Sequence, residues 1–221
     1  MPDYDARLTP ARSDLAAEHL KDAVRAPRYV TGTVLAAVRG VAALRASLSA
    51  SSRLETQLLF GEQFTVYDEA DGWAWGQCAF DGYVGYVERR YLGPERGAIT
   101  HRVCARFSHI YEAGEVKAPA LERLPMNAKL AVSNLGSKFA ELAGGGFVPL
   151  SHIAPLGEAA GDYVAIAEEL LGAPYLWGGR SPDGIDCSGL VQSSLERCGV
   201  AAPRDSDMQE RALGRDVSGG V

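Results

Sequence analysis

The sequence predicts an α+β protein in which two small β-barrels precede a unit that contains helices. Between residues 30 and 155, short runs of alternating apolar residues are separated by glycine turns, as is typical of small barrels. Part of this region is echoed at an offset of 66 residues, which indicates two similar units. From residue 162 onward, apolar residues recur at helical spacing.

The first segment, residues 1–29, is predicted to be helical. Pro10 precedes the pattern, and Ser13 is a suitable cap for a short amphipathic helix within residues 11–26. The residues at helical spacing are Leu15, Ala16, His19, Leu20 and Ala23. We expect this helix to pack on a neighbouring unit.

The two β units are predicted over residues 30–96 and 97–155. Asp71-Gly72 is a typical two-residue hairpin turn between runs in which apolar side chains alternate, such as Trp73 and Trp75. These two tryptophans share one strand face, so we expect them in the core or at the rim of the first barrel.

The echo between the two units consists of two matched pairs of segments. Residues 58–66 match residues 124–132 at an offset of 66, and residues 82–87 match residues 145–150 at an offset of 63. A three-residue deletion in one turn reconciles the two offsets.

The last unit is predicted over residues 156–221, after a linker at residues 155–161. Asp162 is expected to cap a helix that ends before Gly172. A second helix begins at Cys187 and ends at Gly199. Its apolar stripe comprises Cys187, Leu190, Val191, Ser194, Leu195 and Cys198.

Cys187 is predicted to lie in the first turn of this helix, at the head of its buried face. Unpaired backbone N–H groups and the positive end of the helix dipole stabilise a thiolate there, and the same N–H groups can hold an oxyanion. Asp186 and Ser188 flank the cysteine with polar groups, and Gly189 lets another backbone approach closely. Cys187 is therefore a candidate nucleophile. The other cysteines, Cys78, Cys104 and Cys198, are expected to be small buried side chains.

Three blocks around Cys187 resemble the NlpC-type cysteine peptidases, a papain-like family that cleaves peptides of the bacterial cell wall. The blocks are Tyr-x-Trp-Gly-Gly at 175–179, Asp-Cys-Ser-Gly-Leu-Val at 186–191 and Pro-Arg-Asp-Ser-Asp-Met-Gln at 203–209. The resemblance implies that Cys187 is the nucleophile and that the last unit is the N-terminal part of a papain-like catalytic domain.

The resemblance also implies substrate-binding roles for three neighbours of Cys187. Asp186 and Ser188 are expected to hold the free amine of a wall peptide, and Tyr175 is expected to line the catalytic cleft. The residues by themselves leave simpler alternatives open. Asp186 can be only an N-cap, Ser188 only a first-turn helix residue, and Tyr175 only a packed aromatic.

The first β unit resembles the bacterial SH3-like modules that often precede NlpC-type domains, through Gly-Tyr-Val-Gly-Tyr-Val at 82–87. Both β units are accordingly expected to be SH3-like. Such modules tether the enzyme to wall polymer, or close one end of the cleft so that only short peptides with a free amino end fit. Tyr83 is the candidate for closing the cleft, and an ordinary strand aromatic is the alternative.

A catalytic histidine is missing from the positions where the resemblance requires it. The family uses a histidine on a strand after the cysteine helix, whereas this chain has no histidine after His152. His19, His101, His109 and His152 are expected to have structural roles. The sequence therefore favours a C-terminally truncated and inactive form of a longer enzyme, in which the cysteine helix exposes its apolar stripe.

Composition and motif spacing also indicate which partners, location, metals and cofactors to expect. The chain has 221 residues, a formal charge of −6 and 47% hydrophobic residues, which is ordinary for a globular protein. No cluster of Lys and Arg indicates a nucleic-acid partner. No segment is typical of a secretory signal or a membrane span, and four scattered cysteines favour a reducing compartment, so the cytoplasm is expected. No spacing of ligands indicates a metal, and no cofactor is expected.

The resemblance implies a cysteine endopeptidase that acts on murein peptides during recycling. The expected bond joins γ-D-glutamate to a diamino acid in peptides with a free N-terminal L-alanine. Two alternatives remain open: a thiol acyltransferase on the same fold, and a non-catalytic module that binds wall peptides.

Overall fold

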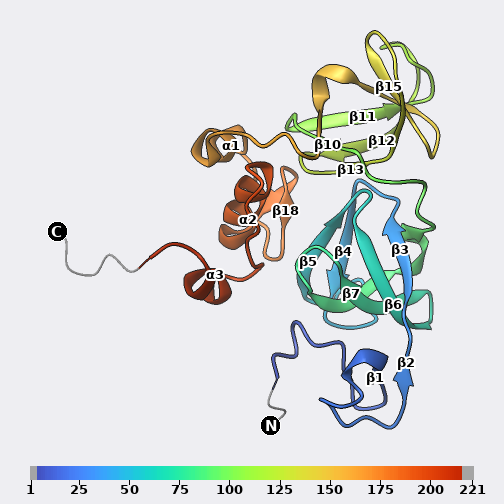
Figure 1. The fold of residues 1–221 in the computed structure, drawn as a ribbon, viewed down its shortest axis with the longest axis vertical. Coiled ribbons are helices and arrows are strands. Elements are labelled where there is room, and N and C mark those ends of the chain that lie inside the picture. Colours follow the sequence, from blue (N-terminus) through green and yellow to red (C-terminus); the bar gives the residue numbers. More distant parts are fainter. Residues whose placement is uncertain (1–3, 216–221) are drawn as a thin grey trace, which may run out of the picture.

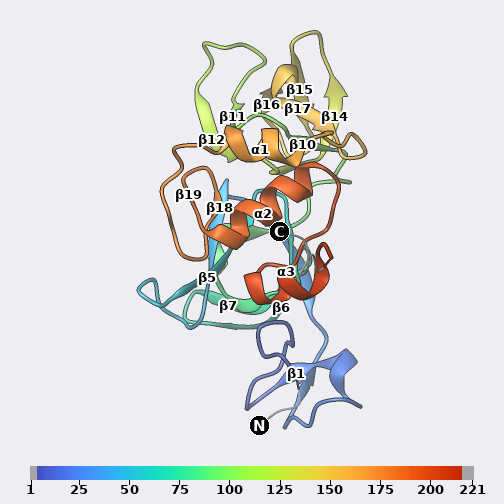
Figure 2. The ribbon, with the colours of Figure 1, turned by 90° about the vertical axis from the view of Figure 1, so that its left-hand side faces the viewer.

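The computed structural model describes residues 4–215, which form an N-terminal arm, two β units and a C-terminal unit with helices (Figure 1). The arm (residues 4–30) lies at one end of the molecule, the first β unit lies in the middle, and the second β unit lies at the other end. The helices of the C-terminal unit lie along one side of the β units, as the perpendicular view shows (Figure 2).

The arm corrects the prediction of a helix within residues 11–26. It contains a short parallel pair of strands and one 3-10 turn: β1 (Ala16–Ala17), η1 (Glu18–Leu20) and β2 (Tyr29–Val30). Leu15 and Ala17 pack with Tyr67 and Trp75 of the first β unit. Leu15, Ala16 and Ala17 are all fully buried. Three consecutive buried residues do not fit a surface helix with one apolar face, so packing against the β unit outweighs the helical periodicity.

The first β unit is an antiparallel sheet of seven strands in the order β5-β4-β8-β7-β6-β3-β9. The strands are β3 (Thr33–Ala37), β4 (Val41–Arg45), β5 (Leu54–Leu59), β6 (Gln63–Ala70), β7 (Trp73–Cys78), β8 (Val84–Glu88) and β9 (Leu92–Gly93), with the turn η2 (Arg89–Tyr91). Asp71 and Gly72 join β6 to β7 with positive φ angles of 50° and 80°. This is the left-handed geometry of a type I′ turn, so the predicted hairpin is confirmed.

The second β unit has two antiparallel sheets, in the orders β13-β10-β17 and β12-β11-β16-β15-β14. The strands are β10 (His101–Val103), β11 (Phe107–Tyr111), β12 (Ala120–Pro125), β13 (Lys129–Leu130), β14 (Val132–Leu135), β15 (Phe139–Leu142), β16 (Phe147–Pro149) and β17 (Ile153–Pro155), with the turn η3 (Leu150–His152).

Closed barrels are not confirmed in either β unit. Each sheet has two edge strands that do not hydrogen-bond to each other within residues 4–215, such as β5 and β9 in the first unit. Curvature brings the strands around a core, but the final hydrogen-bonded seam that defines a barrel is not found.

The internal echo corresponds to a repeated turn. Gly61 and Asn127, which are 66 residues apart, both have positive φ angles, of 78° and 70°. The turn hydrogen bond from Glu62 N–H to the carbonyl of Leu59 has its counterpart between Ala128 and Pro125. In both units the same three elements come last: a strand (β8 or β16), a 3-10 turn (η2 or η3) and a short strand (β9 or β17). The sequence similarity at the two offsets therefore reflects a similar order of elements.

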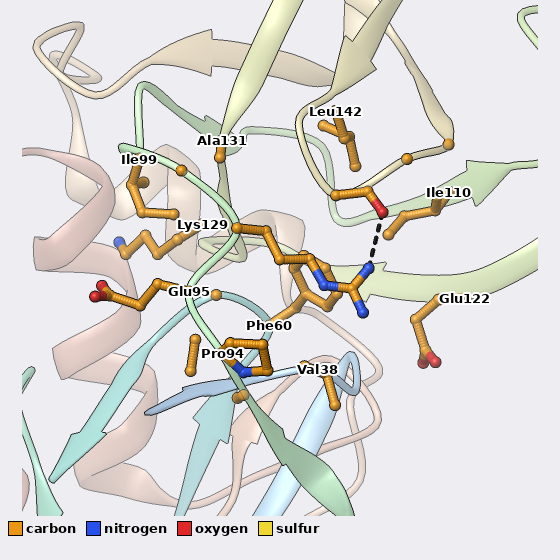
Figure 3. Close-up of a pocket in the computed structure, with 18 of the residues that line it drawn as sticks. Val38, Phe60, Pro94, Glu95, Ile99, Ile110, Glu122, Lys129, Ala131 and Leu142 are labelled. Carbon is orange, nitrogen blue, oxygen red and sulfur yellow. Dashed lines mark hydrogen bonds between the residues drawn. The ribbon is translucent and has the colours of Figure 1, made fainter. Parts of the chain in front are cut away.

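A cavity of about 420 Å³ separates the two β units. Figure 3 shows Val38 and Phe60 of the first unit on one side of this cavity and Ile110 and Leu142 of the second unit on the other. Each unit has its own cluster of buried residues, and Lys129 N–H donates to the carbonyl of Phe60 at 2.7 Å. Each unit thus has its own core, and Phe60 of the first unit also packs against the core of the second.

The C-terminal unit contains α1 (Tyr163–Glu169), β18 (Arg180–Ser181), β19 (Gly184–Ile185), α2 (Cys187–Arg197) and α3 (Ser206–Ala212). The predicted cap of α1 is confirmed, because Asp162 Oδ1 accepts the N–H of Val164 at 2.8 Å. Within residues 4–215, no helix is long and apolar enough to cross a membrane.

Helix α2 buries the face opposite to the predicted one. The buried residues are Ser188, Gly189, Gln192, Ser193, Ser194, Glu196 and Arg197. Of the predicted stripe, only Ser194 is buried; Cys187 and Val191 are exposed, and Leu190, Leu195 and Cys198 are half-buried. The stripe is thus partly exposed, and a polar face packs against the β units.

Ion pairs make the burial of this polar face possible. Arg180, at the start of β18, donates to Glu62 Oε2 at 3.0 Å and to Glu196 Oε2 at 3.3 Å, and Lys129 pairs with Glu196. The side chains of Arg180 and Glu62 are 1% and 3% exposed. Asn127 Nδ2 also donates to the carbonyl of Ser193 at 2.9 Å. Both β units therefore hold α2 in place.

We predict that Arg180→Met lowers the free energy of unfolding by about 3–5 kcal/mol, because it leaves the buried carboxylates of Glu62 and Glu196 without this cation. Urea unfolding followed by circular dichroism measures the change. Arg90→Met is the matched control, since Arg90 forms an exposed pair with Glu88, and it should change the stability by less than about 1 kcal/mol. An Arg180→Met protein as stable as the wild type would contradict the role of the buried network.

Candidate active site

Cys187 is the first residue of α2, and its side chain is exposed. Asp186 is the N-cap, with extended backbone at φ −97° and ψ 177°, and its Oδ1 accepts the N–H of Gly189 at 2.7 Å. This cap ends β19 and begins the helix, so Cys187 lies beside the unpaired N–H groups of the first turn. Its predicted place at the helix start is confirmed. Its predicted place on the buried face is wrong, because ion pairs bury the other face.

Gly189 permits the close backbone approach that the sequence predicts. A Cβ added to Gly189 would lie 2.2 Å from the carbonyl oxygen of Gly179. Gly179 has the same constraint, because its Cβ would lie 2.2 Å from the carbonyl oxygen of Gly184. The first turn of α2 and the β18–β19 pair therefore pack backbone against backbone, and side chains at these glycines would separate them.

Arg204 is a buried cation behind the first turn of α2. Its guanidinium donates to both oxygens of Asp186, at 3.0 and 2.7 Å, to Ser188 Oγ at 2.9 Å and to Thr56 Oγ1 at 2.9 Å. Gly178 N–H also donates to Asp186, at 2.8 Å. Burial opposes the ionisation of Asp186, but the hydrogen bonds and charge of Arg204 outweigh it and hold the pKa of Asp186 below its ordinary value.

These bonds give Asp186 and Ser188 clear structural roles. Both oxygens of Asp186 accept hydrogen bonds from within the protein, as its interpretation as an N-cap requires. The hydroxyl of Ser188 accepts from Arg204 and donates to Asp186 Oδ1 at 3.3 Å. Their contact with a substrate amine stays a prediction.

A cavity of about 290 Å³ opens beside Cys187. It brings together the five residues that the sequence singles out: Tyr83, Tyr175, Asp186, Cys187 and Ser188. It also contains seven residues to which the sequence assigned no role: Arg7, Arg53, Glu55, Trp177, Asp205, Ser206 and Asp207. The arm, the first β unit and the C-terminal unit all contribute to its walls.

Tyr83 connects the first β unit to the C-terminal unit. It lies just before β8, is 3% exposed, and its hydroxyl donates to Asp205 Oδ2 at 2.8 Å. Burial and this hydrogen bond to a carboxylate raise the pKa of Tyr83, so the phenol stays neutral and acts as a donor. Tyr83 is thus part of the cavity wall in addition to the core. Tyr175, on the C-terminal unit, is 67% exposed and lines the same cavity, so it is not a packed aromatic.

The side chains that line the cavity include more carboxylates than guanidinium groups. Four carboxylates (Glu55, Asp186, Asp205 and Asp207) and two guanidinium groups (Arg7 and Arg53) line it. Arg53 Nη2 donates to Glu55 Oε1 at 2.6 Å, and Arg7 Nη1 donates to Asp205 Oδ2 at 2.7 Å. Two further arginines pair with these carboxylates without lining the cavity: Arg204 with Asp186 at 2.7 Å and Arg211 with Asp207 at 2.7 Å. The carboxylate oxygens on the wall can accept hydrogen bonds from a cationic group of a ligand.

None of the four histidines of the chain lines the cavity. His101 and His152 belong to the second β unit, where His152 Nδ1 lies 3.0 Å from Ser108 Oγ and His101 Nδ1 lies 2.9 Å from Thr100 Oγ1. His19 lies in the arm and His109 in β11. Residues 4–215 therefore supply Cys187 with no imidazole base.

Some of the cavity residues to which the sequence assigned no role stand in a recognisable motif, and others do not. Asp205 and Asp207 fall within the third sequence block, next to residues that were already singled out. Glu55 looks like any polar residue of an alternating strand, and Arg7 lies in a segment with no local motif. Only tertiary contacts bring these last two to the cysteine.

Two parts of the chain match models of known families. Residues 44–92 match the bacterial dipeptidyl-peptidase SH3 domain, and residues 172–219 match the NlpC/P60 family. The first match covers most of the first β unit, and the second includes the helix of Cys187.

Curated relatives and solved structures agree with these matches. A γ-D-glutamyl-L-lysine dipeptidyl-peptidase of Bacillus subtilis is 28% identical over 181 residues, which cover 76% of this chain and 61% of that protein. A probable endopeptidase of Mycobacterium tuberculosis is 45% identical over 65 residues, which cover 28% of this chain and 17% of that protein. The chain thus spans less than two thirds of the length of these relatives.

The crystal structure of an NlpC/P60 family protein from Bacillus cereus has a similar fold, with a TM-score of 0.73 and 20% identity, over 85% of this chain and 79% of that chain. The solved structure, the curated relatives and the two family matches are consistent with one another. The chain is thus similar to the bacterial dipeptidyl-peptidase SH3 domain over residues 44–92 and to the NlpC/P60 family over residues 172–219, the segment that carries the cysteine.

Proposed function

We propose that this chain supplies the nucleophile and the substrate pocket of a cysteine endopeptidase that cleaves short murein peptides. One observation carries the proposal: an exposed cysteine at the N-terminus of a helix opens into a cavity whose wall includes four carboxylates and, from the first β unit, Tyr83. A nucleophile, first-turn N–H groups and a pocket for one end of a peptide are the parts that acyl transfer requires.

Cys187 would act as the nucleophile in this reaction. Its Sγ attacks the scissile carbonyl, its proton passes to a base, the amine leaves, and water then releases the acyl group from the sulfur. The N–H groups of Cys187 and Ser188 find no acceptor within residues 4–215, so they are available to the oxyanion of the tetrahedral intermediate. Since no histidine lines the cavity, an imidazole base would have to come from outside residues 4–215.

The cavity suits a short peptide that begins with a free amine. Its volume of about 290 Å³ is near the lower end of typical ligand pockets, about 300–1,000 Å³. Asp205 and Glu55 supply negative charge beside the neutral hydroxyl of Tyr83. An ammonium group at this end is favoured over the neutral amide of a longer chain. Such a pocket would select peptides already released from the wall.

The name of the Bacillus subtilis relative suggests the bond that is cleaved. We infer a substrate with a free N-terminal L-alanine followed by γ-D-glutamate and a diamino acid, cut between the last two. Turnover of released peptides in the cytoplasm, as part of recycling, is the setting that such a substrate implies.

A binding module without hydrolysis is the second candidate. The observation in its favour is that no histidine of this chain lines the cavity. The same thiol could also pass an acyl group to an amine or alcohol in place of water. Adding a competing amine to the peptide mixture distinguishes acyl transfer from hydrolysis by the product.

We predict that the chain binds L-Ala-γ-D-Glu-diamino acid tripeptide at least about tenfold more tightly than its N-acetylated form, since one charge-assisted contact contributes roughly 1.5–3 kcal/mol. Isothermal titration calorimetry measures both affinities. Asp205→Asn should reduce the preference, whereas Asp22→Asn, a change in the arm outside the cavity, should retain it. Equal affinity for the two peptides would contradict the amine pocket.

We predict that iodoacetamide at neutral pH modifies Cys187 before Cys78. Cys187 is exposed, whereas Cys78 is buried, and burial raises the pKa of the Cys78 thiol well above its ordinary value. Mass spectrometry of tryptic peptides gives the order of labelling. The tripeptide should slow the labelling of Cys187 alone. If it slowed no site, the cavity would not be the place where the peptide binds.

We predict that the chain by itself hydrolyses the tripeptide at least about 10²-fold more slowly than a relative with a complete site, because a general base contributes about 10²–10⁴-fold. Chromatography of the released diamino acid measures the rate. Added imidazole should raise the rate of the wild type but not of Cys187→Ser. Hydrolysis at the full rate of a relative, without imidazole, would refute the need for an external base.

A further inference from the structure

Arg7 of the arm reaches a cluster of carboxylates beside Cys187, although almost 200 residues separate it from them in sequence. Its Nη1 donates to Asp205 Oδ2 at 2.7 Å and to Asp207 Oδ1 at 3.0 Å. Its Nη2 donates to Asp207 Oδ2 at 3.0 Å and to Asp5 Oδ2 at 2.8 Å, and its Nε donates to Asp5 Oδ1 at 3.0 Å. All three guanidinium nitrogens are therefore engaged with carboxylates.

The backbone around Arg7 is fixed on the first β unit. Val84 N–H donates to the carbonyl of Arg7 at 2.8 Å, and Gln77 Nε2 donates to the carbonyl of Leu8 at 2.8 Å. The side chain of Leu8 packs against the core of that unit. Val84 is the first residue of β8 and directly follows Tyr83. Arg7 and Tyr83 therefore reach the C-terminal unit from the same place on the first β unit.

Arg7 and Tyr83 meet at the same oxygen of Asp205. Asp205 Oδ2 accepts from Arg7 at 2.7 Å and from the Tyr83 hydroxyl at 2.8 Å. Asp205 Oδ1 accepts from no donor within residues 4–215, and the side chain does not cap α3 although Asp205 stands at the N-cap position. Asp205 is 26% exposed and lines the cavity of Cys187.

We propose that Arg7 is a positioning residue for the substrate amine: by holding Asp205 Oδ2 it orients the carboxylate so that Oδ1 is left for the ammonium group of the peptide. This inference rests on the proposed function. It makes the N-terminal arm, which has no local motif, a part of the specificity site.

The charge of Arg7 does not cancel the attraction for a substrate cation. Three carboxylates, those of Asp5, Asp205 and Asp207, surround the guanidinium group of Arg7, and Arg211 also pairs with Asp207, which leaves one negative charge in excess. The hydrogen bonds from Arg7 hold the pKa values of Asp5 and Asp207 below their ordinary value. These two groups are therefore ionised at neutral pH.

The planar fork of arginine suits this task better than a lysine would. A guanidinium group can donate to three carboxylates in fixed directions, whereas an ammonium group is a single point charge on a flexible stem. A lysine at position 7 would keep the charge but lose the fixed orientation of Asp205.

The test measures how tightly the whole 221-residue chain binds the free-amine tripeptide and its N-acetylated form. Arg7→Gln should weaken binding of the free-amine peptide by about tenfold and leave the N-acetylated peptide unchanged, because one charge-assisted hydrogen bond to the amine is misaligned. Arg7→Lys should give an intermediate loss. Arg12→Gln is the matched control on the same arm, since Arg12 pairs with Asp14 and Asp68 away from the cavity, and should bind both peptides like the wild type.

Two outcomes would overturn the proposal. The first is that Arg7→Gln retains the full preference for the free amine, and the second is that it weakens binding of both peptides equally, as a purely structural role requires. If the wild type itself showed no preference, the proposed amine pocket would fail together with this inference. A wild-type preference that survives in Arg7→Gln would remove only the role of Arg7. Intermediate binding by Arg7→Lys keeps the test valid if Arg7→Gln is poorly folded.

Discussion

The structure depends on a buried charge network that holds helix α2 against the β units. Arg180 and Glu62 are almost fully buried, and Glu196 of α2 pairs with Arg180 and with Lys129. Buried ions are costly unless each has a partner with good geometry, so such a network tolerates few alternative arrangements. It sets the position of α2, and the position of α2 sets where Cys187 meets the first β unit.

The same principle applies at the front of the helix, where a second buried cation organises the residues around the cysteine. Arg204 holds Asp186 and Ser188, so these side chains cap and brace the first turn of α2. The acidic groups that remain for a ligand come from elsewhere: Glu55 from the first β unit and Asp205 from the start of α3. The cavity is therefore made at the junction of units, and no single unit contains it.

Local patterns in the sequence predicted much of the fold. The Asp71-Gly72 turn and the cap at Asp162 depend on neighbouring residues and are found as predicted, and the echo in the sequence corresponds to a repeated turn at Gly61 and Asn127. The spacing of apolar residues gave wrong predictions where contacts with distant residues determine which side chains are buried. The arm is not an α-helix, α2 buries its polar face, and the β units do not close into barrels.

The sequence by itself singled out the candidate nucleophile, Cys187, and four other residues of its cavity. It could do so because Tyr83, Tyr175, Asp186 and Ser188 each stand in a short motif. Tertiary structure alone decided that Glu55 and Arg7 belong to the same cavity. The physical reason is the distance in sequence between the residues that interact. A cap, a turn or a helix start is stabilised by bonds between residues a few positions apart, whereas a pocket shared by three units depends on long-range ion pairs that no local pattern encodes.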